Sequence, residues 1–195
     1  MNLADLKQRL RRETVNKILA MKREQRDAEE GELAEKLVTL PGFDGARRVL
    51  LFVSAFAEEV RTEPLLREVI ERGKMLICPR VDRKGRTLRL FEVEDHAADL
   101  RPGAMGIPEP RAGCRQVDPS EVDWVLVPGL AFDGDCARLG RGAGYYDRLL
   151  PTLRHEVLRW ALIFEAQWVD EVPVGPYDVA LDGVVSCLRT AIRGR

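Results

Sequence analysis

Four short apolar runs constrain the fold of this chain more than any other feature of its sequence. They span residues 49–53, 75–78, 124–127 and 160–164. Each run is bounded by polar or turn-forming residues and is shorter than an ordinary helix, which is typical of strands buried on both faces of a sheet. Because strands that alternate with helical patterns form βαβ units, the sequence predicts a three-layer α/β/α fold with a mainly parallel sheet.

The longest helical pattern covers residues 3–40. Leucine, isoleucine and methionine recur there at roughly helical intervals, and lysine, arginine and glutamate occupy the other faces. We expect Gly31 to break this segment into two helices and Pro41-Gly42 to end it.

Shorter elements are predicted between the apolar runs. Residues 64–72 predict a helix with Thr62 as its N-cap and Gly73 at its end. We expect Pro79 to end the strand at 75–78. Residues 87–93 alternate apolar and basic side chains, which predicts a half-exposed strand.

Composition limits the function classes. The chain has 195 residues, of which 45% are hydrophobic, so we expect a single domain over residues 1–195. A formal net charge of -1 gives no electrostatic signature of nucleic-acid or membrane binding. The four cysteines form no CxxC pair, which disfavours a zinc site. The first residues are polar, which disfavours a secretory signal, and no apolar run approaches the ~20 residues of a membrane span. We therefore expect a reduced cytoplasmic protein, monomeric, that binds neither nucleic acid nor membrane.

The segment 127–148 (VPGLAFDGDCARLGRGAGYYDR) carries the chemistry. It follows a buried strand and precedes a helical pattern at 145–153, which is where open α/β sheets place ligand sites. Its alternating glycines leave successive backbone N–H groups free to approach a phosphate, and three arginines can add charge-assisted hydrogen bonds. These residues are Gly140, Gly142, Gly144, Arg138, Arg141 and Arg148.

Neither common phosphate-binding motif fits this segment. Tyr145 stands where G-x-G-x-x-G needs its last glycine, and no Lys-Ser or Lys-Thr follows the glycines as a P-loop requires. A Gly-x-Gly-x-Gly run alone also suits a plain flexible loop. The arginine before it and the Tyr-Tyr-Asp after it make the pattern more specific.

With these flanks, residues 128–148 resemble the signature of the 5-formyltetrahydrofolate cyclo-ligases, also called methenyltetrahydrofolate synthetases. Further matches occur in the family's order along nearly the whole chain. They are K-x-x-L-R at 7–11, E-[VI]-x-T at 59–62, G-I-x-E-P at 106–110, Gln167, and the closing pattern Pro173, Asp178 and Leu181-Asp182. Three positions depart from the family: Cys136 replaces a usual glycine, Ala143 a common glycine or lysine, and Tyr177 a frequent histidine or asparagine. We expect the loop at Cys136 to turn differently for this reason.

The resemblance implies a fold of the ribose-phosphate isomerase or CoA-transferase-like type and an ATP-dependent reaction. In that reaction 5-formyltetrahydrofolate closes to 5,10-methenyltetrahydrofolate, the formyl oxygen is phosphorylated, and ADP and phosphate are released. The implied ligands are ATP, Mg²⁺ and the folate. The helical segment 1–40 would pack on or over the active site.

The resemblance also implies a role for each matching residue. The ATP-binding set is Lys7, Arg11, Arg138, Leu139, Gly140, Arg141, Gly142, Ala143, Gly144, Tyr145 and Tyr146. The folate-binding set is Ser54, Glu59, Met105, Gly142 and Tyr145. Arg138 and Tyr145 would be catalytic, and Asp147 and Asp178 would hold the metal.

Several residues keep a second interpretation from the sequence alone. Lys7 and Arg11 share one helix face, which can equally be a solvated surface. Asp147 can simply favour the dipole of its helix. Apolar side chains at Phe56, Met105 and Ile107 suit either a pterin-binding wall or the core, and Glu58 is expected to face away from its neighbour Glu59.

Two other functions stay open at this point. The same broad fold also carries sugar-phosphate isomerases and acyl-CoA transferases, and fold does not determine function. A nucleotide- or folate-binding protein without catalysis is the other alternative.

Overall fold

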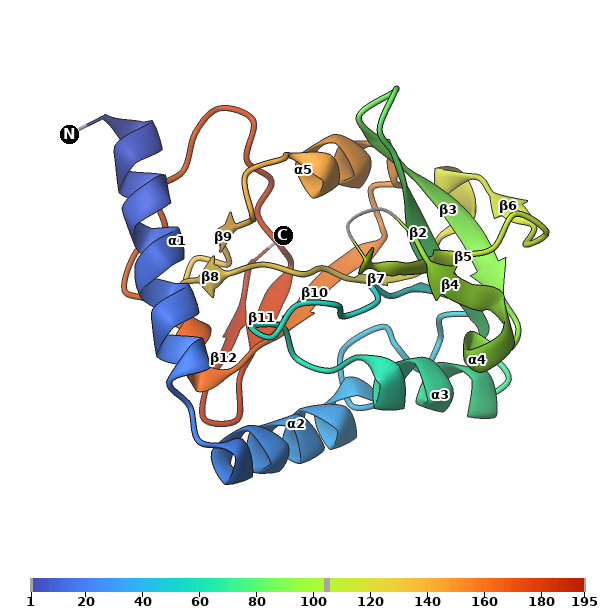
Figure 1. Cartoon of the computed structure of the whole chain (residues 1–195), viewed down its shortest axis with the longest axis horizontal. Helices are drawn as coiled ribbons and strands as arrows, with labels where there is room; N and C mark the ends of the chain where they lie inside the picture. The colour runs from blue at the N-terminus through green and yellow to red at the C-terminus, as the bar shows by residue number, and fades with distance from the viewer. Residues whose placement is uncertain (1, 104–105, 195) are drawn as a thin grey trace.

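The computed structural model describes residues 2–103 and 106–194 (Figure 1). Within these ranges, eight strands form one sheet in the order β12-β11-β10-β7-β1-β2-β3-β6. Their bounds are β1 Arg48–Leu50, β2 Met75–Asp82, β3 Thr87–Val93, β6 Gln116–Val117, β7 Trp124–Leu126, β10 Leu158–Leu162, β11 Gly183–Val185 and β12 Thr190–Ile192. The five strands from β11 to β2 are parallel to one another. Strands β12 and β3 run antiparallel to them, and β6 pairs antiparallel with β3. The predicted mainly parallel sheet is confirmed.

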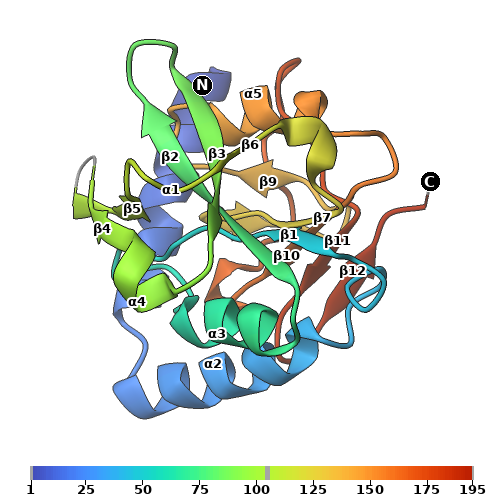
Figure 2. The same cartoon turned by 90° about the vertical axis from the view of Figure 1, so that its right-hand side faces the viewer.

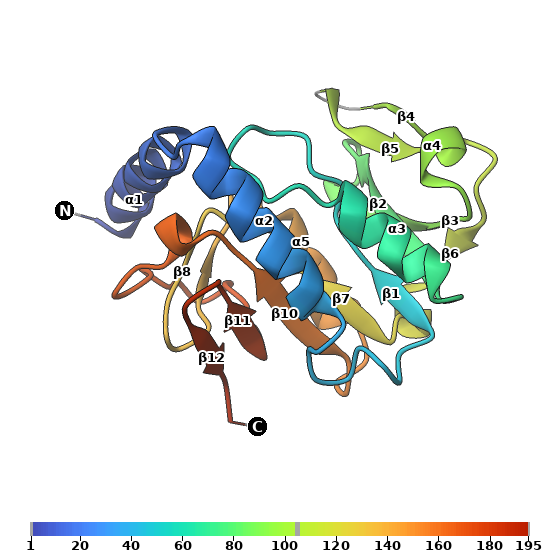
Figure 3. The same cartoon turned by 90° about the horizontal axis from the view of Figure 1, so that it is seen from below.

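Helices cover both faces of this sheet. They are α1 Leu3–Leu19, α2 Arg23–Leu37, α3 Glu63–Glu71, α4 His96–Asp99 and α5 Tyr145–Leu149. Helices α2 and α3 lie side by side across one face, and α5 lies over the other (Figures 1 and 3). Short 3-10 turns at Pro119–Glu121, Leu150–Thr152 and Glu165–Gln167 complete the helical elements. Among the described residues, no helix is long and apolar enough to cross a membrane.

The apolar runs are buried on both faces, as predicted. In β1, Val49 packs into the core under α2 and α3, whereas Leu50 packs into the core under α5. The same alternation separates Trp124 from Val125 in β7. A strand that must fill two cores has no polar face, which is why these runs are continuously apolar.

The N-terminal helical segment breaks at residues 20–22, so the break predicted at Gly31 is wrong. Lys22 has an extended backbone and starts α2, and Gly31 lies inside that helix. A Cβ atom at Gly31 would meet no atom within 4 Å. A glycine on an exposed helix face costs roughly 1 kcal/mol relative to alanine, which weakens the helix without ending it.

Strand β2 continues through Pro79 to Asp82, so the strand end predicted at Pro79 is also wrong. Strand β1 pairs with β2 only as far as Ile77, and beyond that point β2 pairs with β3 alone. A proline is tolerated there because one side of the strand needs no N–H donor. The extension carries the β2–β3 hairpin well beyond the rest of the sheet (Figure 2).

Two small ribbons complete the fold. Strands β4 (Leu100–Pro102) and β5 (Pro108–Pro110) form one, and β8 (Ala131–Phe132) and β9 (Arg138–Leu139) form the other. The helix predicted at 145–153 is present as α5 followed by a 3-10 turn. Thr62 precedes α3 as predicted, but its hydroxyl caps no helical N–H and instead accepts the N–H of Ser54 at 2.8 Å.

Candidate active site

A cavity of about 490 Å³ opens beyond the carboxyl ends of β1 and β7. The segments that follow these strands supply part of its lining, including Phe52 and Gly129. The β2–β3 hairpin, β5, Arg138 of β9, the glycine-rich loop at 140–144 and the start of α5 supply the rest. Ligand sites of open α/β sheets lie at this edge, and the volume is typical of a small-molecule site.

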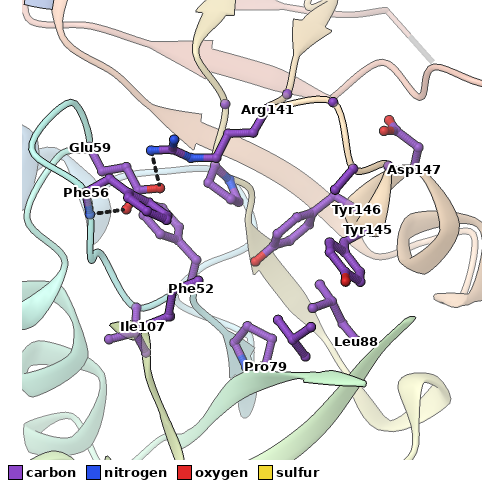
Figure 4. Close-up of a pocket in the computed structure, with 18 of the residues that line it drawn as sticks. Phe52, Phe56, Glu59, Pro79, Leu88, Ile107, Arg141, Tyr145, Tyr146 and Asp147 are labelled. Atoms are coloured by element: carbon purple, nitrogen blue, oxygen red, sulfur yellow. Dashed lines mark hydrogen bonds and ion pairs between the residues drawn. The ribbon is translucent and has the colours of Figure 1, made fainter. Parts of the chain in front are cut away.

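One wall of the cavity is apolar. It consists of Phe52, Val53, Phe56, Pro79, Val81, Leu88, Ile107 and Pro108. Figure 4 shows five of these side chains facing a common space. The structure therefore assigns Phe56 and Ile107 to the cavity wall, while Met105 lies outside the described residues. Pro79, Val81 and Leu88 were not predicted to line the site. The alternation of apolar residues beyond Pro79 could have indicated that this strand continues and turns one face toward the cavity.

The glycine-rich loop forms the opposite wall. Gly142 and Gly144 have φ angles of 105° and 69°, a region that side chains other than glycine rarely adopt. Ala143, between them, has no such φ, so it imposes no strain. Cys136 has a φ of 60°. The chain thus takes a glycine-type turn at Cys136 despite the thiol, and the expectation of a different turn is wrong.

Arg138 lies beneath this loop with 3% of its side chain exposed. Its Nη1 donates to the carbonyl of Pro128 at 3.1 Å and its Nη2 to Asp147 Oδ1 at 2.6 Å. Its buried Nε has no hydrogen-bond partner among the described residues. A Cβ atom at Gly140 would lie 2.8 Å from Arg138 Nη1, so only glycine lets the backbone approach the guanidinium this closely. The cation is therefore fixed against the loop.

Helix α1 approaches the same loop from its other side. Arg11 Nε donates to the carbonyl of Gly140 at 2.8 Å, and Lys7 forms an ion pair with Asp178. Burial lowers the pKa of Arg11, and the nearby Asp178 carboxylate raises it. Arg11 is thus packed against the glycine-rich loop and Lys7 against Asp178, so neither is placed on an open helix surface, although neither lines the cavity.

Arg141 connects the glycine-rich loop to the segment after β1. Its Nη2 lies 2.9 Å from Glu58 and 3.4 Å from Glu59, and its guanidinium lies 3.7 Å from the centre of the Phe56 ring. Figure 4 shows Arg141 reaching across to Glu59 and Phe56. The expectation that Glu58 faces away from Glu59 is therefore wrong. The chain turns at this point, where the Glu59 N–H donates to the Phe56 carbonyl, and both carboxylates meet one guanidinium.

Glu59 also organises its own segment. Its Oε2 accepts the N–H groups of Ala55 at 2.9 Å and of Phe56 at 3.2 Å. The carboxylate therefore holds Phe56 in the cavity wall.

This geometry agrees with comparisons to known proteins. The model of the 5-formyltetrahydrofolate cyclo-ligase family matches residues 4–187. The chain belongs to this family. A 5-formyltetrahydrofolate cyclo-ligase of Escherichia coli is 31% identical over 80% of this chain and 86% of its own, and one of mouse is 29% identical over 93% and 90%. The NMR structure of Aquifex aeolicus 5,10-methenyltetrahydrofolate synthetase superposes with a TM-score of 0.82 at 31% identity, covering 100% of this chain and 95% of its own.

The two adjacent tyrosines, Tyr145 and Tyr146, both line the cavity (Figure 4). The hydroxyl of Tyr146 is buried and has no partner among the residues described, and burial raises the pKa of this group. Tyr146 also packs against both cores, whereas the ring of Tyr145 lies 5.4 Å from the guanidinium of Arg148. Arg138 Nε and the Tyr146 hydroxyl can each form a hydrogen bond with a ligand. Leaving a buried polar group without a hydrogen bond costs about 1–3 kcal/mol, so such a bond would favour binding.

Ser54 and Leu139 of the predicted site do not line the cavity either. Ser54 Oγ accepts the N–H of Thr62 at 3.0 Å and so fixes the entry to α3. Leu139 is 1% exposed and packs with Ala131 and Val172 in a separate small core, so only its backbone faces the loop. The sequence motif places both residues near the site without showing which way their side chains point.

The two carboxylates predicted to bind the metal each form an ion pair with a basic side chain of the protein. Asp147 lines the cavity and pairs with Arg138, and Asp178 pairs with Lys7 and accepts the Gly175 N–H. Over residues 2–103 and 106–194, no group of three or more His, Cys, Asp or Glu is placed to hold a metal ion. Mg²⁺ often takes only one or two carboxylates and completes its shell with phosphate oxygens and water. Of the two carboxylates, Asp147 lines the cavity and Asp178 does not, so Asp147 is the one placed to meet a phosphate-bound Mg²⁺ there.

Proposed function

We propose that this chain converts 5-formyltetrahydrofolate and ATP into 5,10-methenyltetrahydrofolate, ADP and phosphate. Membership of the cyclo-ligase family supports this reaction and disfavours the isomerase and acyl-CoA transferase alternatives. The observation that carries the proposal is the junction inside one cavity of an apolar wall with a glycine-rich, arginine-backed loop. A flat pterin needs the first surface, and a triphosphate needs the second.

The chemistry requires alignment more than a covalent partner. The formyl oxygen attacks the γ-phosphorus, the bond to the bridging oxygen breaks, and ADP leaves. N10 of the folate then attacks the activated formyl carbon, the carbon–oxygen bond breaks, phosphate departs, and the N10 proton is lost. Phosphoryl transfer of this kind is accelerated mainly by positioning and by cations around the phosphates.

Arg138 is the proposed cation at the transferred phosphoryl group. It lines the cavity together with the apolar wall and the loop, and its hydrogen bond to the Pro128 carbonyl and the close Gly140 backbone fix its orientation. A preoriented cation stabilises developing charge without reorganising during the reaction. Tyr145 is proposed to contact the reacting ends of both substrates from the cavity lining.

The remaining phosphates are proposed to lie between the glycine-rich loop and α1. Backbone N–H groups of residues 140–146 would surround them, and Lys7 and Arg11 would supply charge from the helix. A bound Mg²⁺ would neutralise phosphate charge, and Asp147 and Asp178 are the residues proposed to hold it.

On the folate side, Glu59 is proposed to act by fixing the loop that carries Phe56. Both of its carboxylate oxygens already accept hydrogen bonds or face Arg141.

The same proposal extends to the setting of the enzyme. We propose that residues 1–195 work as one domain and as a cytoplasmic monomer. The four cysteines are free thiols, which suits a reducing compartment.

The test is to mix the purified protein with 5-formyltetrahydrofolate and MgATP and to follow the absorbance of the methenyl product. Product formation that requires ATP is the expected result. Folate binding without product would instead favour the non-catalytic alternative. No binding of folate would refute the proposal.

A further inference from the structure

The β2–β3 hairpin ends in a cluster of exposed cations. We call Arg83, Lys84, Arg86 and Arg148 the hairpin cluster, and all four are exposed. Within the part of the chain that the structure describes, none of them forms an ion pair with a carboxylate. The nearby Asp82 carboxylate instead accepts the backbone N–H groups of Lys84 and Gly85. In a chain with a formal net charge of -1, this is a local excess of positive charge.

The hairpin cluster is fixed to the active site. Arg148, from α5, donates from Nε to the carbonyl of Arg86 at 2.7 Å and from Nη2 to that of Ala143 at 2.9 Å. It therefore ties the hairpin tip to the glycine-rich loop. Figure 1 shows the hairpin tip beside α5.

The cavity leads to this cluster. Val81 and Leu88 face each other across β2 and β3, and both line the cavity. The hairpin tip lies immediately beyond this pair. Leu88 lies beside Tyr145 in the cavity, on the side away from Glu59 and Phe56 (Figure 4). A ligand in the apolar part can therefore reach the hairpin cluster by passing over Leu88.

Two separate groups of cations flank the glycine-rich loop. On the α1 side, Arg11 meets it at Gly140 and Gly142, and Lys7, one helical turn away, pairs with Asp178. The hairpin cluster meets it at Ala143 and Gly144 from the opposite side. The proposed function uses the first group for the triphosphate. It leaves the second group without a ligand.

Arg86 adds an independent observation. Its φ of 52° lies in the left-handed region, where an arginine is strained by roughly 1 kcal/mol and a glycine is not. The Arg86 carbonyl accepts a hydrogen bond from Arg148, but the exposed Arg86 side chain makes no ion pair with any described residue, so no side-chain ion pair offsets this strain. Strained residues often occur where a side chain serves a ligand.

We propose that the hairpin cluster binds the carboxylates of the glutamate end of the folate substrate. This inference rests on the proposed function, because it takes the pterin to lie against the apolar wall. With the pterin there, the far end of the molecule passes Val81 and Leu88 and reaches Arg83, Lys84 and Arg86. Carboxylates are the anions that the folate presents at that end, and guanidinium groups bind them with charge-assisted hydrogen bonds.

The experiment compares 5-formyltetrahydrofolate with 5-formyltetrahydropteroate, which lacks the glutamate. The variant is R83Q/K84Q/R86Q, which spares Arg148 because that side chain contacts the glycine-rich loop. Exposed ion pairs contribute up to about fivefold each, so we expect the intact protein to bind the glutamate form about tenfold more tightly. In the variant this preference should fall to about one, while the KM for ATP and kcat stay unchanged. The matched control R12Q/K17Q/K22Q removes three exposed cations of the N-terminal helices and should keep the preference.

Equilibrium binding of both compounds, measured by calorimetry, separates this inference from the reaction itself. If the wild-type protein binds them without forming product, the proposed function fails, and the tenfold preference and its loss still test the hairpin cluster. An unchanged preference in R83Q/K84Q/R86Q would overturn the inference. A raised KM for ATP in that variant would also overturn it, because the cluster would then serve the triphosphate.

Discussion

At the residue scale, the proposed activity depends most strongly on the position and orientation of the Arg138 guanidinium group. We predict that Arg138→Lys lowers kcat by about 10²–10³-fold while the protein stays folded. The lysine keeps the charge but cannot contact Pro128 and Asp147 with two planar nitrogens at once. The measurement is steady-state turnover together with circular dichroism.

Arg154 offers a matched control for this substitution. It also bonds a backbone carbonyl, that of Val122 at 3.0 Å, and carboxylates, those of Asp123 at 2.8 Å and Glu156 at 3.4 Å, and none of these residues lines the cavity. Arg154→Lys should leave kcat within about twofold. An equal loss from both variants would show that the effect is structural rather than local to the cavity.

At Cys136 the backbone has a conformation that few side chains tolerate. Its φ of 60° is costly for a side chain that branches at Cβ, and its thiol is buried. We predict that Cys136→Val lowers the free energy of unfolding by about 2–3 kcal/mol, whereas Cys136→Gly changes it by less than about 1 kcal/mol. For glycine, relief of strain offsets the lost packing. Urea unfolding measures both changes.

Cys78 provides the comparison, because it is equally buried in β2 without a positive φ. Cys78→Val should cost less than about 1.5 kcal/mol. A similar cost at both positions would assign the effect to volume, and the backbone argument would fail.

At the element scale, α1 contributes Lys7 and Arg11, one turn apart on the same helix face, to the proposed nucleotide site. We predict that Lys7→Gln raises the KM for ATP about tenfold and leaves the KM for the folate unchanged, because Lys7 lies on the α1 side of the glycine-rich loop. Lys17→Gln on the exposed face of the same helix is the control and should change neither constant. Equal shifts in both KM values for Lys7→Gln would mean that α1 supports the whole cavity rather than the nucleotide.

The sequence predicts elements well where local pattern decides them. The continuously apolar runs around Val49 and Trp124 predict strands buried on both faces, and they are. The strand end at Pro79 and the helix break at Gly31 were wrong because they depend on neighbours. Pro79 is tolerated only because β1 ends beside Ile77, and Gly31 is tolerated because its helix face is open.

The same division holds within the site. The glycine-rich loop and its cations were predictable, because their motif lies in one continuous segment. The apolar wall was only partly predictable, since Phe52 after β1 and Leu88 in β3 line one cavity only because the fold brings their segments together. The direction of a single side chain, such as Glu58 toward Arg141, depends on a turn that the sequence does not indicate.

At the scale of the whole molecule, three of the cations around the glycine-rich loop are already paired with carboxylates. Lys7 of α1 pairs with Asp178 near the C-terminus, Arg138 with Asp147, and Arg141 with Glu58 and Glu59. A triphosphate that takes these cations must displace the carboxylates. Partly buried carboxylates left without a partner cost free energy, so the ion pairs compete with the nucleotide.

Because of this competition, removing the two carboxylates should strengthen the binding of free ATP and should weaken the benefit that Mg²⁺ brings to ATP binding. Wild-type protein should bind ATP at least about tenfold more weakly in EDTA than in Mg²⁺, because the metal stabilises the displaced Asp147 and Asp178. In Asp147→Asn/Asp178→Asn, ATP in EDTA should bind more tightly than to the wild type, and added Mg²⁺ should help little. Calorimetry measures all four affinities without turnover. Asp44→Asn/Asp170→Asn removes the same charge from exposed positions and should behave as the wild type. If Asp147→Asn/Asp178→Asn instead weakens ATP binding in EDTA, the two carboxylates position Arg138 and Lys7 for the phosphates rather than compete with them.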